Sequence, residues 1–101
     1  MADMSSVAVA IALITILAGH HGVDPAYMLC LAEHESDYRQ EAIGQAGEIG
    51  VFQILPSTGA WFASKSGLSG DLTDLMANIN LTAWAVSQGY GWMWSTNRLC
   101  Q

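Results

Sequence analysis

The chain has 101 residues and a formal net charge of −6, with nine Asp and Glu residues against three Lys and Arg. This acidic balance argues against nucleic acid and anionic membrane surfaces as partners, and a hydrophobic content of 51% with 12% charged residues excludes a disordered chain. The length fits one small domain, residues 1–101, which we expect to be a monomer. The fixed positive charges are Arg39, Lys65 and Arg98.

The first predicted element is an uncharged run rich in Ala, Ile and Leu, residues 7–18. No Lys or Arg precedes it, which distinguishes it from a typical signal peptide, and it is shorter than the ~20 residues of a membrane-spanning helix. We expect a first helix capped by Ser5 or Ser6 and buried along one face, with a retained export signal as the alternative. The buried face consists of Val7, Ile11, Ile14 and Ala18.

A second helix is predicted to begin at Pro25, because Pro is favoured in the first helical turn and Asp24 before it is a good N-cap. Apolar side chains then recur at helical spacing until a carboxylic acid takes the last position of the stripe. The stripe consists of Met28, Leu31, Ala32 and Glu35.

Glu35 is therefore the first candidate for a catalytic residue. Burial disfavours the charged form of a carboxyl group, and this is one way in which proteins prepare a general acid. The alternative is a boundary residue that reaches solvent. Glu33 lies roughly 200° around the helix from Glu35, at ~100° per residue, so we expect it on the solvated face, with His34 at the rim.

The region after the second helix is rich in glycine. The glycines within residues 42–50 favour tight turns and a small hairpin or an irregular wall at a cleft. Pro56 is predicted to begin a third helix that runs through Ala63, followed by a linker over residues 66–70.

A fourth helix is expected, with Asp71 or Thr73 as its cap and Gly89 at its end. The chain contains no internal repeat, and the predicted fold class is mostly α. The apolar stripe of the fourth helix consists of Leu75, Ile79, Thr82 and Val86.

Three motifs occur in order along the chain. They are Gly22-Val23-Asp24-Pro25 before the second helix, Glu35-Ser36 at its end, and Gly50-Val51-Phe52-Gln53-Ile54-Leu55-Pro56-Ser57-Thr58 after the glycine-rich region. Together they resemble the signatures of the soluble lytic transglycosylases, relatives of goose-type lysozyme, over roughly residues 7 to 80. Val51-Phe52 replaces the Leu-Met usual in that family, and Asn78-Ile79 is similar to its later Asn-Ile pair.

The resemblance implies a lysozyme-like small helical domain with a glycan-binding cleft and peptidoglycan strands as substrate. Glu35 would protonate the bond between N-acetylmuramic acid and N-acetylglucosamine and then draw the muramic C6 hydroxyl onto C1. Ser36 and Gln53 would orient this acid and the N-acetyl group of the substrate. The product would be a 1,6-anhydro sugar, formed without water, cofactor or metal.

Two alternatives stay open. A goose-type lysozyme reaction would use Glu35 with an attacking water and a second carboxylate, for which the candidates are Asp37, Glu48 and Asp71. A catalytically silent glycan-binding or virion structural module is the non-enzymatic alternative.

The C-terminal region departs from the family pattern. It lacks the Tyr-Asn-x-Gly motif whose Tyr reaches the catalytic acid, and it has Gly89-Tyr90-Gly91-Trp92-Met93-Trp94 instead. Tyr90 is the candidate for a substrate-binding role, with packing at the end of the core as the alternative. The short tail is similar to those of phage-encoded members, which implies an endolysin or virion enzyme that acts on the cell wall outside the cytoplasm.

The two cysteines, Cys30 and Cys100, bear on the same compartment. An even number in a small protein that acts outside the cytoplasm predicts a disulfide bond, which would tie the C-terminal tail to the second helix and shape one wall of the cleft. Two buried free thiols are the alternative. The cysteines lack the short spacing of a zinc site and His20-His21 adds only a loosely placed pair, so we expect no metal.

Overall fold

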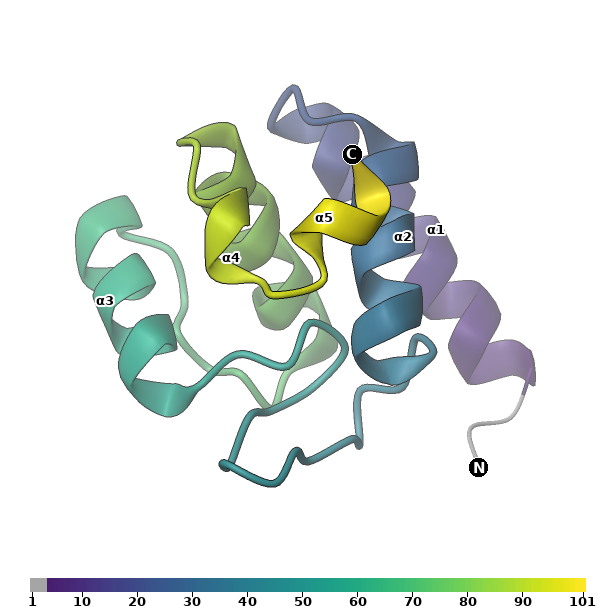
Figure 1. Cartoon of the computed structure of the whole chain (residues 1–101), viewed down its shortest axis with the longest axis horizontal. Coiled ribbons are helices and arrows are strands. Elements are labelled where there is room, and N and C mark those ends of the chain that lie inside the picture. The colour runs from purple at the N-terminus through teal and green to yellow at the C-terminus, as the bar shows by residue number, and fades with distance from the viewer. Residues whose placement is uncertain (1–3) are drawn as a thin grey trace.

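The computed structural model describes residues 4–101 and is mostly helical, as predicted (Figure 1). Its helices are α1 (Met4–His20), α2 (Pro25–Ser36), α3 (Pro56–Ser66), α4 (Leu75–Ser87), the 3-10 helix η1 (Gly91–Met93) and α5 (Asn97–Cys100). α1 packs against α2 and α4, α3 packs against α4, and α5 returns to α2. Within residues 4–101 the only β-structure is two isolated antiparallel bridges, Ile43 with Ile49 and Ile49 with Ile54.

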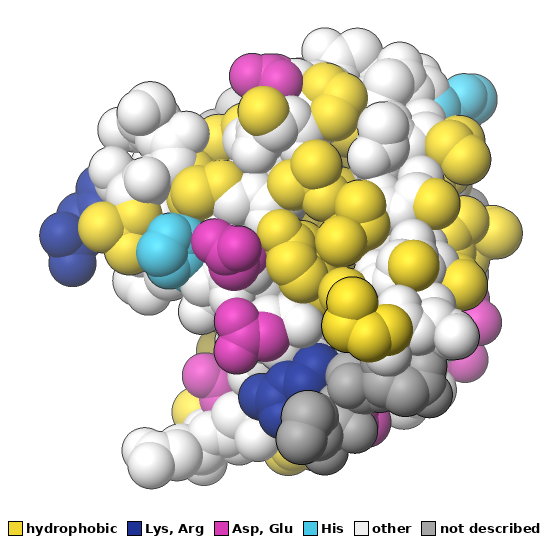
Figure 2. Space-filling model, turned by 90° about the vertical axis from the view of Figure 1, so that its right-hand side faces the viewer, with side chains coloured by type: hydrophobic (Ala, Val, Ile, Leu, Met, Phe, Trp, Pro, Cys, Tyr) yellow, Lys and Arg dark blue, Asp and Glu magenta, His cyan; other side chains and the backbone are white. Residues whose placement is uncertain are grey.

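α1 covers the predicted first helix but buries only one narrow face. Ile14 and Ala18 are fully buried, as the sequence predicts, whereas Val7 and Ile11 are half-buried at the edge of this face. The outer face carries exposed apolar side chains, and Figure 2 shows such side chains gathered on this side of the molecule. The large ones are Met4, Val9 and Ile16. No helix within residues 4–101 is long and apolar enough to cross a membrane.

α2 begins and ends at clear local signals. Asp24 caps it, with Oδ1 accepting from the backbone N–H two residues on at 2.9 Å, and Pro25 is its first residue. After the helix, Asp37 and Tyr38 adopt left-handed backbone conformations with φ of 54° and 63°. These two residues turn the chain away from α2 and begin the link segment, residues 37–55, which leads to α3 (Figure 1).

Two of the predicted helix caps are wrong. α1 begins before Ser5 and Ser6, so both lie inside its first turn, where their side chains are exposed. The cap of α4 is Asp74, whose Oδ2 accepts from the third backbone N–H of the helix at 2.9 Å. Asp71 instead accepts from the backbone and the hydroxyl group of Thr73. Such a local turn competes with helix formation, so α4 begins after it.

α3 and α4 otherwise follow the prediction. α3 begins at Pro56 and extends to Ser66, the first residue of the predicted linker, and Gly89 follows the end of α4 with a φ of 89°. The core lies between α1, α2, α3, α4 and the link segment. The largest fully buried side chains include Ile14, Met28, Leu31, Val51, Phe52, Phe62, Ile79 and Leu81.

The centre of the link segment, residues 50–52, is buried although it lies in no helix or β-bridge. Val51 and Phe52 expose none of their surface, so their backbone groups need partners inside the protein. Side chains from four separate places supply these partners. Ser36 Oγ donates to Val51 O at 2.7 Å, Gln40 Oε1 accepts from Val51 N at 3.0 Å, Asn78 Oδ1 accepts from Phe52 N at 3.2 Å, and Trp94 Nε1 donates to Phe52 O at 2.8 Å.

Asn78 is the most heavily used of these side chains. Its Nδ2 also donates to the backbone carbonyls of Ile49 at 3.1 Å and Leu72 at 3.0 Å, so one fully buried amide joins α4 to two other segments. Gly50 lies directly against it with a φ of 82°, and a Cβ at this position would overlap the side-chain amides of Asn78 and Gln40. Glycine is therefore required at the start of this buried stretch.

A disulfide bond joins Cys30 on α2 to Cys100 at the end of α5, which confirms the predicted pairing. The two residues are 70 positions apart in the sequence, so the bond closes most of the chain into one loop. Because closing a long loop restricts the unfolded chain, the bond stabilises the folded state by about 4 kcal/mol on the chain-entropy model.

We expect reduction of this bond to lower the free energy of unfolding by about that amount, as measured by urea unfolding with and without a reductant. The Cys30→Ala, Cys100→Ala double variant is the control, because its stability should not respond to reductant. Two free thiols in the denatured, unreduced wild-type protein would contradict the pairing.

Replacing Asn78 by Ala should cost about 2 to 4 kcal/mol, because it leaves the buried backbone N–H of Phe52 without a partner and removes two further hydrogen bonds. Asn80→Ala on the same helix is the matched control: Asn80 is half-buried and its amide makes one side-chain contact, to His21 Nε2 at 2.7 Å. Equal losses of stability in the two variants would show that the buried amide has no special role.

Candidate active site

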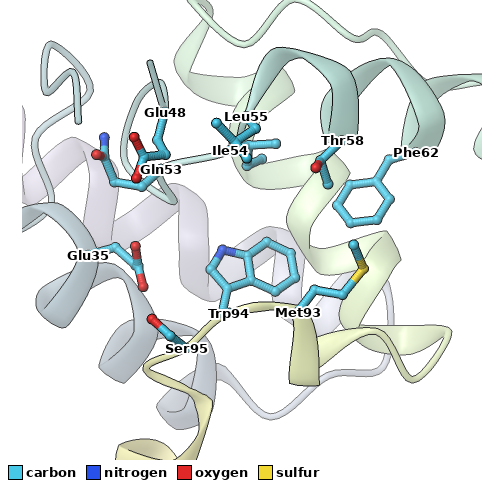
Figure 3. A pocket seen from close by; sticks show the side chains of 10 residues that line it. All are labelled: Glu35, Glu48, Gln53, Ile54, Leu55, Thr58, Phe62, Met93, Trp94 and Ser95. Atoms are coloured by element: carbon cyan, nitrogen blue, oxygen red, sulfur yellow. The ribbon is translucent and has the colours of Figure 1, made fainter. Parts of the chain in front are cut away.

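A pocket of about 210 Å³ lies where the end of α2, the link segment, α3 and the C-terminal region meet (Figure 3). Its wall combines two carboxylates and several hydroxyl and amide groups with apolar and aromatic surface. The lining residues are Glu35, Glu48, Gln53, Ile54, Leu55, Thr58, Phe62, Met93, Trp94 and Ser95. Ligand sites in proteins combine apolar and aromatic surface with a few polar groups that fix the orientation of the ligand, and this wall has both.

Glu35 reaches this pocket from the last turn of α2. The apolar residues before it on the predicted stripe are fully buried, while Glu35 itself is half-buried with its carboxylate at the pocket wall. One carboxylate oxygen, Oε2, accepts a hydrogen bond from Thr96 Oγ1 at 2.6 Å. Glu33 and His34 are exposed, in agreement with the helix geometry predicted for them.

Ser36 lies next to Glu35 in the sequence but does not line the same pocket. It is 4% exposed, its hydroxyl group donates to Val51 O, and it accepts from the backbone N–H of Arg39 at 3.1 Å. Its hydroxyl group therefore holds the link segment against the end of α2.

Gln53 does line the pocket, and it has a left-handed backbone conformation with a φ of 50°. Its Nε2 donates to the backbone carbonyls of Ala42 at 3.1 Å and Gly50 at 2.8 Å. These two bonds fix the side chain against the link segment, so Gln53 presents a rigid polar wall next to Glu35 (Figure 3).

Glu48 is a second carboxylate in the pocket. It lies on the link segment across from Glu35 (Figure 3), and its Oε1 accepts from the backbone N–H of Ala46 at 2.8 Å. The other two candidates for a second acid lie elsewhere: Asp37 is exposed at the end of α2, and Asp71 is exposed in the turn before α4. Within residues 4–101, Glu48 is thus the only other carboxylate that lines this pocket.

Sequence reasoning gave Glu48 no more weight than the other two acids. The available signal was the glycine-rich region itself, which predicts an irregular cleft wall. The structure bears this out, because Ile43 and Ile49 form a bridge and Glu48 occupies the wall beside it.

Tyr90 lies behind the pocket wall, not in it. Its half-buried ring stacks on Phe62, with centroids 6.1 Å apart and an angle of 13°, and also contacts Trp61 and Trp84. Phe62 in turn lines the pocket, so Tyr90 supports the wall from the far side. The hydroxyl group that reaches Glu35 is that of Thr96, which sequence reasoning did not single out.

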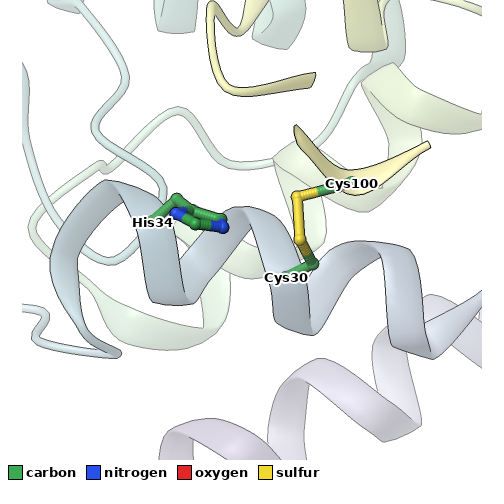
Figure 4. A group of neighbouring side chains, drawn as sticks. All are labelled: Cys30, His34 and Cys100. Carbon is green, nitrogen blue, oxygen red and sulfur yellow. A yellow bond between two sulfur atoms is a disulfide. The ribbon is translucent and has the colours of Figure 1, made fainter. Parts of the chain in front are cut away.

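The sulfur atoms of Cys30 and Cys100 lie close to His34 on the surface of α2 (Figure 4). To bind a metal ion, this group would have to supply its two cysteines as thiolate ligands. Both sulfur atoms are bonded to each other here, so this group has no thiolate to offer a metal ion.

Two similarities to known proteins bear on the family of this chain. Residues 12–96 match the family described as "Transglycosylase SLT domain". The chain is also similar to Lysozyme 1 of Musca domestica, with 35% identity in an alignment that covers 70% of this chain and 60% of that protein. The chain therefore spans less than two thirds of that relative's length. Since the family match covers most of the chain and confirms the resemblance drawn from the three motifs, the protein belongs to the transglycosylase SLT domain family.

Proposed function

We propose that the protein cleaves the β-1,4 bond between N-acetylmuramic acid and N-acetylglucosamine in peptidoglycan, with Glu35 as general acid and base. The observation that carries this proposal is the position of Glu35, at the end of a buried apolar stripe and at the wall of a pocket. A general acid must lie within hydrogen-bonding reach of the group that it protonates, and Glu35 presents its carboxyl group to the pocket in which a glycan would bind. Family membership supports the same substrate class.

In the proposed reaction Glu35 donates its proton to the glycosidic oxygen as the bond from that oxygen to muramic C1 breaks. The N-acetyl group of the substrate assists at C1. Glu35, now a carboxylate, takes the proton of the muramic C6 hydroxyl group as its oxygen bonds to C1. The product is a 1,6-anhydromuramic end, no water is consumed, and the enzyme returns to its starting protonation state.

Hydrolysis is the second candidate, and Glu48 is the observation that favours it. Two carboxylates in one pocket are the usual equipment of a hydrolysing glycosidase, in which the second acid activates water or stabilises the positive charge at C1. In this version Glu35 again donates to the glycosidic oxygen, and water takes the place of the C6 hydroxyl group. The name of the fly relative, a lysozyme, is consistent with this chemistry.

Peptidoglycan as substrate places the site of action outside the cytoplasm, in the cell wall or in association with a virion. The acidic net charge of −6 does not oppose this substrate class, because sugars are recognised by hydrogen bonds and aromatic faces. The pocket supplies both kinds of contact. A catalytically silent glycan-binding module would not explain why a carboxylic acid is present at position 35 and reaches the pocket.

Replacement of Glu35 by Gln tests the proposal most directly. The variant keeps the size of the side chain but cannot donate a proton, so the rate of release of muropeptides should fall by about 10²- to 10⁴-fold or more with little change in stability. Glu33→Gln is the matched control on the exposed face of the same helix and should retain activity. Near-normal turnover by the Glu35 variant would exclude the assignment.

The mass of the released muropeptides separates the two candidate reactions. We expect 1,6-anhydromuramic ends, each one water lighter than a hydrolysis product, because an intramolecular hydroxyl group has a large effective concentration at C1. Glu48→Gln should then leave this product unchanged. If the wild-type enzyme instead releases reducing muramic ends, and Glu48→Gln abolishes that activity, the enzyme is a hydrolase.

A further inference from the structure

The hydrogen bond from Thr96 to Glu35 has no part in the reaction as proposed so far. It joins residues 61 positions apart, and its length of 2.6 Å is that expected when a hydroxyl group donates to a carboxylate. It engages Oε2 of Glu35, so this bond fixes the rotation of the carboxyl group at the pocket wall.

Thr96 belongs to the C-terminal segment, residues 94–100, which is attached to the rest of the protein at several points. Trp94 is 6% exposed and its indole N–H donates to Phe52 O at 2.8 Å. The hydroxyl group of Tyr27 donates to Asn97 Oδ1, and burial raises the pKa of this tyrosine above its ordinary value. The disulfide bond attaches the end of the segment to α2.

These attachments leave Thr96 little freedom to move. Tyr27, Cys30 and Glu35 all lie on α2, and each contacts the C-terminal segment. Figure 4 shows the disulfide bond that crosses from α2 to this segment. Within the segment, the backbone N–H of Asn97 donates to Trp94 O at 3.0 Å and that of Leu99 to Thr96 O at 2.9 Å. α2 therefore carries the acceptor, Glu35, and also anchors the segment that carries the donor, Thr96.

We propose that Thr96 is a positioning residue for Glu35: its hydroxyl group holds the carboxyl group in the orientation needed for proton transfer. This inference rests on the proposed function of Glu35. A threonine hydroxyl group has one donor and two acceptor sites. Because Thr96 donates to Oε2, the other oxygen, Oε1, is left to carry the transferable proton. Oε2 can accept from Thr96 both when Glu35 is a carboxylate and when it is protonated on Oε1, so the same hydrogen bond serves both states of the catalytic cycle. Because the donor holds the carboxyl group in one orientation, less conformational entropy is lost when Glu35 reacts.

The comparison of Thr96→Val with Thr96→Ser tests this role. Val matches the shape of Thr but cannot hydrogen-bond, so we expect kcat to fall roughly 10- to 100-fold while KM and the thermal midpoint change little. Ser restores the hydroxyl group and should return most of the activity. Thr15→Val is the matched control, since this exposed threonine on α1 donates only within its own helix, to Ile11 O at 2.9 Å. Equal kcat values for Thr96→Val and the wild type would overturn the proposal, as would equal losses in the Val and Ser variants.

The same substitution in the Glu35→Gln background separates this proposal from the proposed function. If Thr96 acts through the acid, Thr96→Val should not lower the residual activity of Glu35→Gln any further. An active Glu35→Gln variant would refute both assignments. An inactive Glu35→Gln together with a fully active Thr96→Val would refute only the positioning role.

Discussion

The arrangement of this protein depends on keeping a stretch of irregular chain, residues 50–52, inside the core. Val51 and Phe52 are fully buried, and neither lies in a helix or a β-bridge that would pair its backbone. Their N–H and C=O groups would each cost about 1 to 3 kcal/mol if left unpaired. Ser36, Gln40, Asn78 and Trp94 remove that cost by side-chain hydrogen bonds. Because these side chains come from separate parts of the chain, satisfying one buried loop fixes several elements relative to one another.

This constraint explains what the motif residues do. The run from Gly50 to Thr58 resembles a catalytic signature, yet two of its residues make contacts that hold the fold. Gly50 allows the close approach of Asn78, and the amide nitrogen of Gln53 donates to backbone carbonyls. Ser36, beside the proposed acid, holds the loop and not the acid. The motif thus preserves the shape of the pocket, and the proposed chemistry is left to Glu35 and to the groups that face it.

The C-terminal segment completes the pocket from the other end of the chain. Trp94 and Ser95 line it next to Met93 of η1, Thr96 bonds to Glu35, and the disulfide bond attaches the segment to α2. A chain of 101 residues has little core with which to hold a terminal segment in place. A covalent bond to the helix that carries the proposed acid restricts the position of the segment without enlarging the core.

The sequence alone predicted the features that neighbouring residues determine. These are the start of α2 at Asp24 and Pro25, the buried stripe that leads to Glu35, and the start of α3 at Pro56. It misplaced the cap of α4, because Asp71 and Asp74 are equally good caps until the turn at Thr73 forms. The three motifs supplied the family resemblance. Only the tertiary structure brought Glu48 and Thr96 to Glu35 and moved Tyr90 behind the wall. These contacts follow from the left-handed turn after α2 and from the return of the C-terminus, and sequence periodicity carries no information about contacts between such distant segments.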